Sequence, residues 1–421
     1  MTSTSTSVKI AIVLVISLFF LWGLSYGLVD VMNKNFQNHL HITQHESGFL
    51  QMAYFGAYFI IALPAGYIAQ RFSYKVGILM GLGLYALGCL LIIPATNMAS
   101  FHFFLFAFFI LACGLGSLET NANPYITKLG SPESASFRIN AAQSFNGMGQ
   151  FVGPILAGYL FLSITKAPEN ASDELKEQLL TQNMGNVQLV YVGIAIIVAL
   201  IALAFLFNKL PENIQMKGAE SEAQDTSNVK ASSIFKERHF TLGLLAQFLY
   251  IASQVGAGAF FINYAVEHYH GLSDQQAAYY FSSALIAFMA GRIITTPLMK
   301  KISPHFILGI YGFLSTMLCV ALVFGEGFFS ILALIGLFFF MSIAFPTIFA
   351  LSTKNLNTAQ TKLASSLLIM SIVGGAIMPS IMGLFNDRFG TSAGFLLLIP
   401  CFAYVAWYGF FGSKCKRCEK V

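Results

Sequence analysis

The stretch NKLPENIQMKGAESEAQDTSNVKASSIFKER, residues 208–238, decides how the rest of the chain is read. It contains five basic and five acidic residues and very few side chains that a core could bury. Such a composition is typical of a flexible linker. Because the sequence on both sides is strongly apolar, we expect two folded halves, residues 1–207 and 239–412, and a basic tail at 413–421.

The composition of the whole chain indicates a membrane protein. Hydrophobic residues make up 56% of the 421 residues, charged residues only 10%, and the mean hydropathy is +0.70. A soluble domain usually carries about 25% charged residues. The first apolar run is too long for the core of a signal peptide and lacks a small-residue cleavage site, so we interpret it as a retained helix. The net charge of +5 does not indicate a nucleic-acid partner.

Apolar segments long enough to cross a bilayer occur twelve times, six before the linker and six after it. A spanning helix needs about 20 mostly apolar residues, and strands are excluded because an open sheet edge cannot face lipid. The sequence therefore predicts an all-α integral membrane protein. Its spans are expected at 9–32, 47–70, 75–95, 101–127, 139–162, 187–207, 239–264, 275–299, 305–324, 327–352, 362–386 and 392–412. The polar segment 163–186 is expected to be an outside loop with a short helix.

The positions of the basic residues test this count. If the N-terminus is cytoplasmic, 18 of the 23 Lys and Arg residues fall on the cytoplasmic side, and Arg292 lies within a span. Only four fall outside: Lys34, Lys166, Lys176 and Arg388. Cytoplasmic loops carry an excess of Lys and Arg. We therefore expect a multi-pass protein of the cell (inner) membrane, with both termini in the cytoplasm.

The two halves resemble each other in the loop that follows their second span. The sequence there is GYIAQRFSYKVGIL in the first half and GRIITTPLMKKISPHFIL in the second. Two parallel six-helix halves resemble the major facilitator fold, in which substrate binds near the bilayer midplane. The first loop also resembles that superfamily's G-x-x-x-D-R-x-G-R/K motif. It keeps Gly66, Arg71 and Lys75, with Gln70 at the position of the usual Asp.

Two carboxylates lie inside predicted spans, where ionisable residues are costly and usually functional. Trp22, Tyr26 and Asp30 follow one another at intervals of four, so they share one face of the first span. Glu119, in ACGLGSLETNANP (112–124), lies nine residues before the first cytoplasmic lysine, about 13 Å deep at about 1.5 Å per residue. Because apolar surroundings disfavour the charged form of a carboxylate, we predict that Glu119 and Asp30 take up a coupling proton. Such a proton gains about 2.3 kcal/mol per 100 mV of membrane potential.

Amide side chains form stripes on two other spans. Gln143, Asn146 and Gln150 lie at helical spacing on the fifth span, and Gln254 and Asn263 lie on the seventh. Amides that face a cavity walled by the two aromatic residues of the first span suit a neutral polyhydroxylated solute. Membrane amides also serve only to join helices. That alternative stays open for three of them: Asn123, Gln150 and Gln247.

Other classes of chemistry have little support in the sequence. It contains no phosphate loop, no nucleophile with a matched base, no cofactor motif and no cluster of buried cations for an anionic substrate. Cys415 and Cys418 form a lone CxxC, which is a weak metal or redox signal. Arg292 is interpreted as a snorkelling or inter-helix residue. We therefore expect no enzyme, no catalytic residue, no metal and no resident cofactor.

Six blocks of the sequence resemble the fucose permease and glucose/galactose transporter family. They are FFLWG with the aspartate that follows it, GLGSLETNANPYIT, FRINAAQSFN, GRI, SIAFPTIFALSTKNL and MSIVGGAIMPSIMGLFND. In that family a carboxylate in span 1 and another in span 4 handle sugar and proton, and Asp30 and Glu119 occupy these positions. Gln143 and Asn146 correspond to the family's sugar-binding amides in span 5.

The resemblance also suggests which sugar is carried. Fucose permease has paired asparagines where this chain has Tyr26 and Gly27, a tryptophan at the position of Gly258 and a tyrosine at that of Phe345. The resemblance therefore implies import of a neutral monosaccharide, with a hexose such as glucose or galactose favoured over L-fucose. It implies cation symport by alternating access, with H⁺ as the expected ion and Na⁺ as the alternative. We expect the chain to act as a monomer in the lipid bilayer.

One segment resembles a different class of transporter. GQFVGPILAG, residues 149–158, is similar to the G-x-x-x-G-P signature of major facilitator antiporters. It makes a proton-coupled exporter of drugs or metabolites the alternative function. In the purely structural interpretation, Gly149, Gly153 and Gly158 allow close helix contact and Pro154 bends the span.

Overall fold

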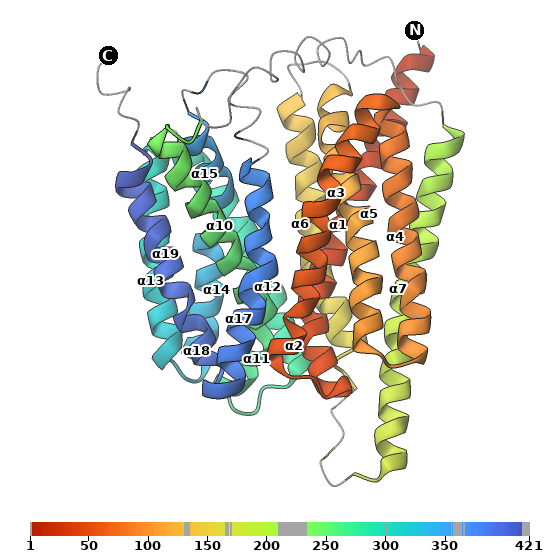
Figure 1. The fold of residues 1–421 in the computed structure, drawn as a ribbon, viewed down its shortest axis with the longest axis vertical. Coiled ribbons are helices and arrows are strands. Elements are labelled where there is room, and N and C mark those ends of the chain that lie inside the picture. The colour runs from red at the N-terminus through yellow and green to blue at the C-terminus, as the bar shows by residue number, and fades with distance from the viewer. Residues whose placement is uncertain are drawn as a thin grey trace. The chain divides into compact units, whose positions relative to one another are not determined.

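The computed structural model describes most of the chain as two helical units (Figure 1). The described residues are 2–129, 135–164, 168, 171–208, 234–299, 301–354, 356, 364 and 367–414, and they contain no strand. The first unit takes in residues 1–43, 49–215 and 274–282, and the second 44–48, 216–273 and 283–421. Most of the predicted linker and the CxxC of the predicted tail lie outside the described residues.

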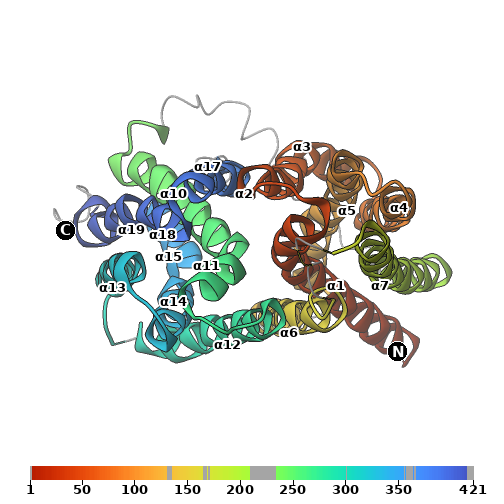
Figure 2. The same cartoon turned by 90° about the horizontal axis from the view of Figure 1, so that it is seen from below.

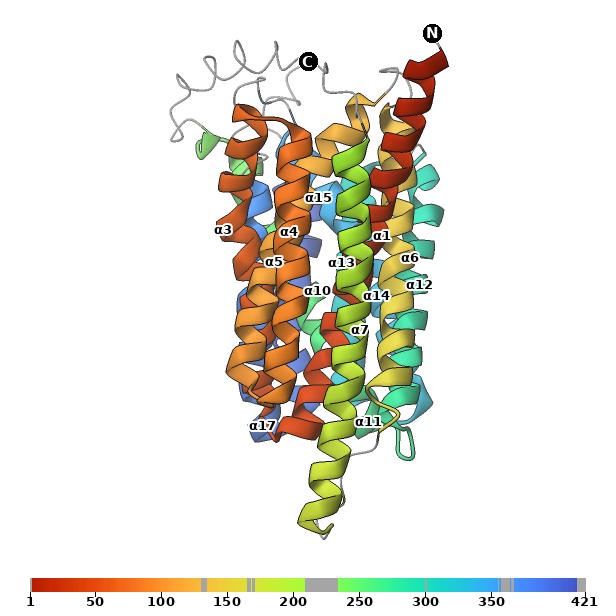
Figure 3. The same ribbon diagram turned by 90° about the vertical axis from the view of Figure 1, so that its right-hand side faces the viewer.

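Among its described residues the first unit contains six long helices, which Figure 2 shows end-on, and the first residues of a seventh. The six are α1 (Thr2–Leu40), α3 (Phe49–Arg71), α4 (Tyr74–Asn97), α5 (Phe101–Lys128), α6 (Ala135–Leu160) and α7 (Asp173–Phe207). Within this unit α1 packs along α6, and α4 packs along α5 (Figure 3). Each helix corresponds to one predicted span of the first half.

Helix α7 is longer than predicted, because its first turns occupy part of the expected outside loop. It begins where Ser172 accepts a hydrogen bond from the Leu175 amide at 3.3 Å, as an N-cap residue does. Asp173 and Glu174 follow in the first turn, where negative charge is favourable. The short helix predicted in this loop is therefore the start of the sixth span.

The second unit contains shorter elements. They are α2 (Gln44–Ser47), α10 (Arg238–Ala259), α11 (Phe261–His268), α12 (Asp274–Leu298), α13 (Pro304–Phe324), α14 (Phe328–Met341), α15 (Ala344–Ser352), the 3₁₀ turn η2 (Ser371–Val373), α17 (Gly374–Phe389), α18 (Thr391–Leu396), α19 (Leu398–Trp407) and the π-helical turn η3 (Tyr408–Gly412). The first residues of α12, 274–282, belong to the first unit.

Breaks interrupt spans that we predicted as continuous helices. The predicted span 239–264 divides into α10 and α11, and the predicted span 327–352 divides into α14 and α15. A backbone carbonyl freed by a break needs a partner, because lipid supplies none. The Tyr250 hydroxyl donates to the Met341 carbonyl at 2.8 Å, and Arg292 Nε donates to the Ser342 carbonyl at 3.2 Å. Arg292 therefore serves as an inter-helix partner, as one interpretation of the sequence suggested.

Length and apolarity make eleven helical segments of the described chain suitable for crossing a membrane. They correspond to eleven of the twelve predicted spans, and the span at 139–162 is the one without such a segment among the described residues. That span is present as α6, a helix of 26 residues, and the amides of its polar stripe lower its hydropathy. The structure thus confirms an all-α membrane protein with the predicted helices.

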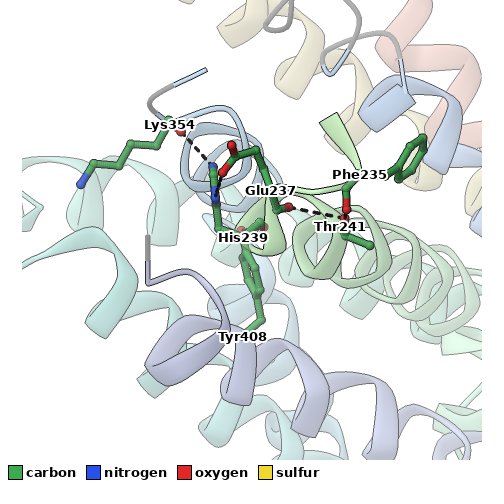
Figure 4. Close-up of polar contacts among 6 residues, drawn as sticks. All are labelled: Phe235, Glu237, His239, Thr241, Lys354 and Tyr408. Atoms are coloured by element: carbon green, nitrogen blue, oxygen red, sulfur yellow. Dashed lines mark hydrogen bonds and ion pairs between the residues drawn. The ribbon is translucent and has the colours of Figure 1, made fainter. Parts of the chain in front are cut away.

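The start of α10 is tied to distant parts of the second unit (Figure 4). His239 Nε2 lies 2.9 Å from the Lys354 carbonyl, and the Tyr408 hydroxyl donates to the His239 carbonyl at 3.1 Å. Ile234, in the predicted linker, is fully buried against Phe240. The last residues of that segment are therefore part of the packed unit, since their apolar side chains find a core there.

Candidate functional site

The close contact between α1 and α6 sets the geometry of the candidate site. Gly23 and Gly27 of α1 face Gly149 and Gly153 of α6, and the backbones touch. A Cβ added at Gly23 would overlap the Asn146 carbonyl, and one at Gly153 would overlap the backbone of Gly27. Two glycines of the antiporter-like segment, Gly149 and Gly153, are therefore used to pack α6 against α1, and the third, Gly158, lies against Ala278 of α12. The contact also brings the amide stripe of α6 against α1.

The amides of that stripe bond mainly to the protein itself. Asn146 is 5% exposed, and its Nδ2 donates to the Phe19 carbonyl of α1 at 3.2 Å. Its Oδ1 accepts from Gln150 Nε2 at 2.8 Å. Gln143 is half-buried and donates to Asn123 Oδ1 of α5 over a long 3.5 Å. Asn146 thus joins helices, whereas the weakly held Gln143 is better placed to exchange its partner for a ligand.

Asp30 lies in α1 and is buried, with 4% of its surface exposed. Gln51 Nε2 of α3 donates to Asp30 Oδ1 at 3.4 Å, the one hydrogen bond that a described residue makes to this carboxylate. Gln51 is itself fully buried, and its Oε1 accepts no hydrogen bond from the described residues. Asp30 is therefore not solvated at an interface, and it keeps bonding capacity for a proton, water or ligand.

Glu119 projects from α5 and is partly exposed. Its carboxylate makes no hydrogen bond or ion pair to any residue that the structure describes, although its neighbours do bond. Thr120 donates to the Gly116 carbonyl at 2.8 Å, and Asn121 Nδ2 donates to the Ser117 carbonyl at 2.7 Å. Those two side chains donate hydrogen bonds to backbone carbonyls of their own helix. The Glu119 carboxylate is thus available to a proton or a ligand.

Two tyrosines of α3 lie within electrostatic range of the carboxylates, and our sequence reasoning missed them. Tyr54 is 1% exposed and lies close enough to both Asp30 and Glu119 to interact with them electrostatically. Tyr58 interacts with Glu119 and with Tyr54, and the two tyrosine rings lie 5.4 Å apart. Together with Gln51 they are spaced by three and four residues. The helical spacing that placed Trp22, Tyr26 and Asp30 on one face of the first span would also have placed these three residues on one face of α3.

Aromatic side chains surround these groups. Tyr26 packs edge-on against Phe55 of α3 at 6.1 Å between ring centroids, and Trp22 packs against Phe19 at 5.8 Å. Both Trp22 and Tyr26 are half-buried, so part of each ring remains accessible. The first unit therefore brings the whole predicted stripe of α1 together with Glu119 around one face of α3.

The remaining predicted residues belong to the second unit. Gln254 of α10 is half-buried and makes no hydrogen bond to the described residues, and Asn263 of α11 is 6% exposed. Gln247, on the same helix as Gln254, is fully buried, and neither end of its amide has a partner among the described residues. Gln247 and Gln254 therefore have bonding capacity that no described residue uses.

Comparison with known proteins finds similar transporters over nearly the full length of the chain. The family described as Major Facilitator Superfamily matches residues 10–371. The L-fucose-proton symporter of Escherichia coli (strain K12) is 36% identical over 418 residues, covering 97% of this chain and 94% of that protein. The glucose/galactose transporter of Brucella abortus biovar 1 (strain 9-941) is 34% identical over 415 residues, covering 98% and 96%. The crystal structure of the transporter FucP in the outward conformation matches with a TM-score of 0.69 and 35% identity, covering 97% of this chain and all of that chain.

Proposed function

We propose a function from one premise: this chain belongs to the Major Facilitator Superfamily. On that premise it imports a neutral monosaccharide by symport with a cation, through alternating access. The observation that carries the proposal is the pair of membrane carboxylates, Asp30 and Glu119, that share Tyr54 as a neighbour. No Lys or Arg side chain of the described residues forms an ion pair with either of them.

Relatives that match nearly the full chain support the substrate class. One is named an L-fucose-proton symporter and another a glucose/galactose transporter, at similar identities. We favour a hexose such as glucose or galactose, because Tyr26, Gly27, Gly258 and Phe345 depart from the fucose permease pattern. We favour H⁺ over Na⁺ as the coupling ion, and we propose neither a resident cofactor nor an enzymatic reaction.

The chemistry of the site suggests how sugar and proton are coupled. An ionised carboxylate in apolar surroundings is costly unless it is hydrogen-bonded or paired. Since Glu119 has no protein partner among the described residues, either a proton or donors from water and sugar hydroxyls must relieve that cost. Proton binding and sugar binding at the Glu119 carboxylate are thus coupled. The accessible faces of Trp22 and Tyr26 offer flat apolar surfaces against which a sugar ring can pack.

The test is uptake by the purified full chain in proteoliposomes. We expect counterflow of labelled D-glucose and D-galactose, weaker counterflow of L-fucose, and accumulation driven by an imposed pH gradient. A Na⁺ gradient of the same size, imposed separately, should drive none. If no sugar in a broad panel is recognised, the proposed substrate class is wrong.

The antiporter alternative differs in the direction of proton movement. Adding substrate to one side of the membrane draws protons from that side in symport and releases them there in antiport. We expect the outside medium to become more alkaline when sugar enters. The packing role of Gly149 and Gly153 leaves the antiporter-like segment without independent support for export.

A further inference from the structure

One face of α3 runs between the two carboxylates. Gln51, Tyr54 and Tyr58 lie on that face, and the first and last are about 10 Å apart along the axis at about 1.5 Å per residue. Gln51 is hydrogen-bonded to Asp30, and the Tyr58 ring lies against Gly116 of α5, three residues before Glu119. Tyr54 lies on α3 between Gln51 and Tyr58, within electrostatic range of both carboxylates. The three side chains therefore form a ladder of polar groups that links α1 to α5.

Each step of this ladder has unused bonding capacity. Gln51 Oε1 and the hydroxyls of Tyr54 and Tyr58 are buried, and none makes a hydrogen bond of good geometry to a described residue. Weaker contacts join the Tyr54 hydroxyl to Tyr58 and the Tyr58 hydroxyl to Trp22. Buried polar groups in native proteins are almost always satisfied by protein or water. Side chains with open capacity beside two carboxylates are suited to bonds that form in only one protonation state.

We propose that Tyr54 is a positioning residue that links the protonation states of Asp30 and Glu119. Its hydroxyl has a single proton, so it donates to only one carboxylate at a time, directly or through one water. When it donates to an ionised Asp30, Glu119 must keep its own proton or find a donor on the substrate. The reverse holds when it donates to Glu119. The effect of Tyr54 on transport rests on the proposed function. The link between the protonation states of the two carboxylates requires no sugar.

Other titratable groups face Tyr54, but they do not serve the same role. Tyr85 of α4 and Tyr191 of α7 interact with Tyr54 and with neither carboxylate. The Tyr85 hydroxyl is already engaged with Ser25 and with the Leu21 carbonyl. The Tyr191 hydroxyl is buried, as that of Tyr54 is. Tyr191→Phe is therefore the matched control, since it removes a buried hydroxyl elsewhere in the unit that also lacks a hydrogen bond of good geometry to the described residues.

The link is tested by infrared difference spectroscopy on the purified full chain. The C=O stretch of a protonated carboxyl group follows the titration of Glu119, and D30N and E119Q assign the bands. We expect D30N to move the midpoint of the Glu119 titration by about 1 pH unit, a tenfold change in proton affinity. In a Y191F background that movement should persist, and in a Y54F background it should disappear.

A shift that is equally large in Y54F and Y191F backgrounds overturns the inference, and so does the absence of a shift in the wild type. Tyr54→Phe keeps the ring that packs against Phe55 and Tyr58. If it nevertheless fails to fold, Y54M removes the same hydroxyl with an adaptable side chain and carries the same expectation.

Transport separates this inference from the proposed function. We expect Y54F to retain sugar counterflow and to lose about tenfold in pH-driven accumulation, a difference of about 1.4 kcal/mol, while Y191F matches the wild type. If the wild type carries no sugar but its carboxylates titrate as a linked pair through Tyr54, only the proposed function fails. If sugar is carried and Y54F accumulates it normally, only the inference fails.

Discussion

Glu119 and Asp30 are both carboxylates of the first unit, but their surroundings differ. Asp30 is held by Gln51 from the neighbouring helix, whereas Glu119 has no hydrogen-bonding partner among the described residues. A group without a protein partner changes its protonation state at lower structural cost, because no bond within the protein has to break. Of the two carboxylates, Glu119 is therefore the better candidate for the one that exchanges the coupling proton.

Replacing Glu119 by glutamine tests that role. The amide keeps the shape of the side chain but cannot ionise, so E119Q should exchange sugar across the membrane and fail to concentrate it. We expect pH-driven accumulation to fall at least about tenfold while counterflow changes less than about threefold, which is under about 1 kcal/mol. Both are measured in proteoliposomes.

The control for E119Q is E267Q. The Glu267 carboxylate accepts hydrogen bonds from the Thr391 amide at 3.2 and 3.3 Å, at the start of α18, so its role is local. That variant should accumulate sugar as the wild type does. Accumulation against a gradient by E119Q would contradict the assignment of Glu119.

At the scale of the element, the contact between α1 and α6 depends on four glycines. It places Asn146 within reach of the α1 backbone and holds the stripe of Trp22, Tyr26 and Asp30 in position. Small residues allow membrane helices to approach closely, and the association then comes from packing and inter-helix hydrogen bonds. This contact is therefore the structural support of the candidate site.

We expect Gly149→Ala to weaken this contact. The added Cβ would overlap the α1 backbone at Phe20 and Leu24, which cannot move as a flexible side-chain end can. The cost of such overpacking is about 1–3 kcal/mol, measured as a lower midpoint of thermal unfolding in detergent. Gly193→Ala in α7 is the matched control, because nothing lies within 4 Å of its added Cβ. Equal midpoints for the two variants would show that the close approach contributes nothing to stability.

At the scale of the whole molecule, the distribution of Lys and Arg predicts which side of the membrane each loop faces. Pro168 is exposed in the segment after α6, and Lys354 is exposed after α15. The positive-inside rule assigns the first to the outside and the second to the cytoplasm. This orientation stays a prediction that labelling in cells can check.

A cysteine at each position tests the orientation in a C415S/C418S background, which leaves four buried cysteines among the described residues. In intact spheroplasts an impermeant maleimide should label P168C and spare K354C. Both should react after the membrane is permeabilised. The opposite pattern would place the termini outside and overturn the predicted orientation.

Much of the fold could be predicted because its cause is local. Lipid requires each spanning segment to satisfy its own backbone, so apolar runs of sufficient length predicted the helices. The breaks near Phe260 and Ser342 escaped prediction, because the partners that make the second break tolerable, Tyr250 and Arg292, come from other helices. Likewise, the sequence around Gln51 and Tyr54 does not indicate that they lie near Asp30, because that residue belongs to another helix.

The sequence by itself therefore determined the class of protein, the positions of its helices and the presence of two carboxylates inside them. Hydropathy and helical spacing depend only on residues near one another in the chain. The tertiary structure alone decided that Asp30 has a hydrogen-bonding partner, that Glu119 has none among the described residues, and that Tyr54 lies within electrostatic range of both. These facts depend on distances between helices, which arise from packing such as the glycine contact of α1 with α6.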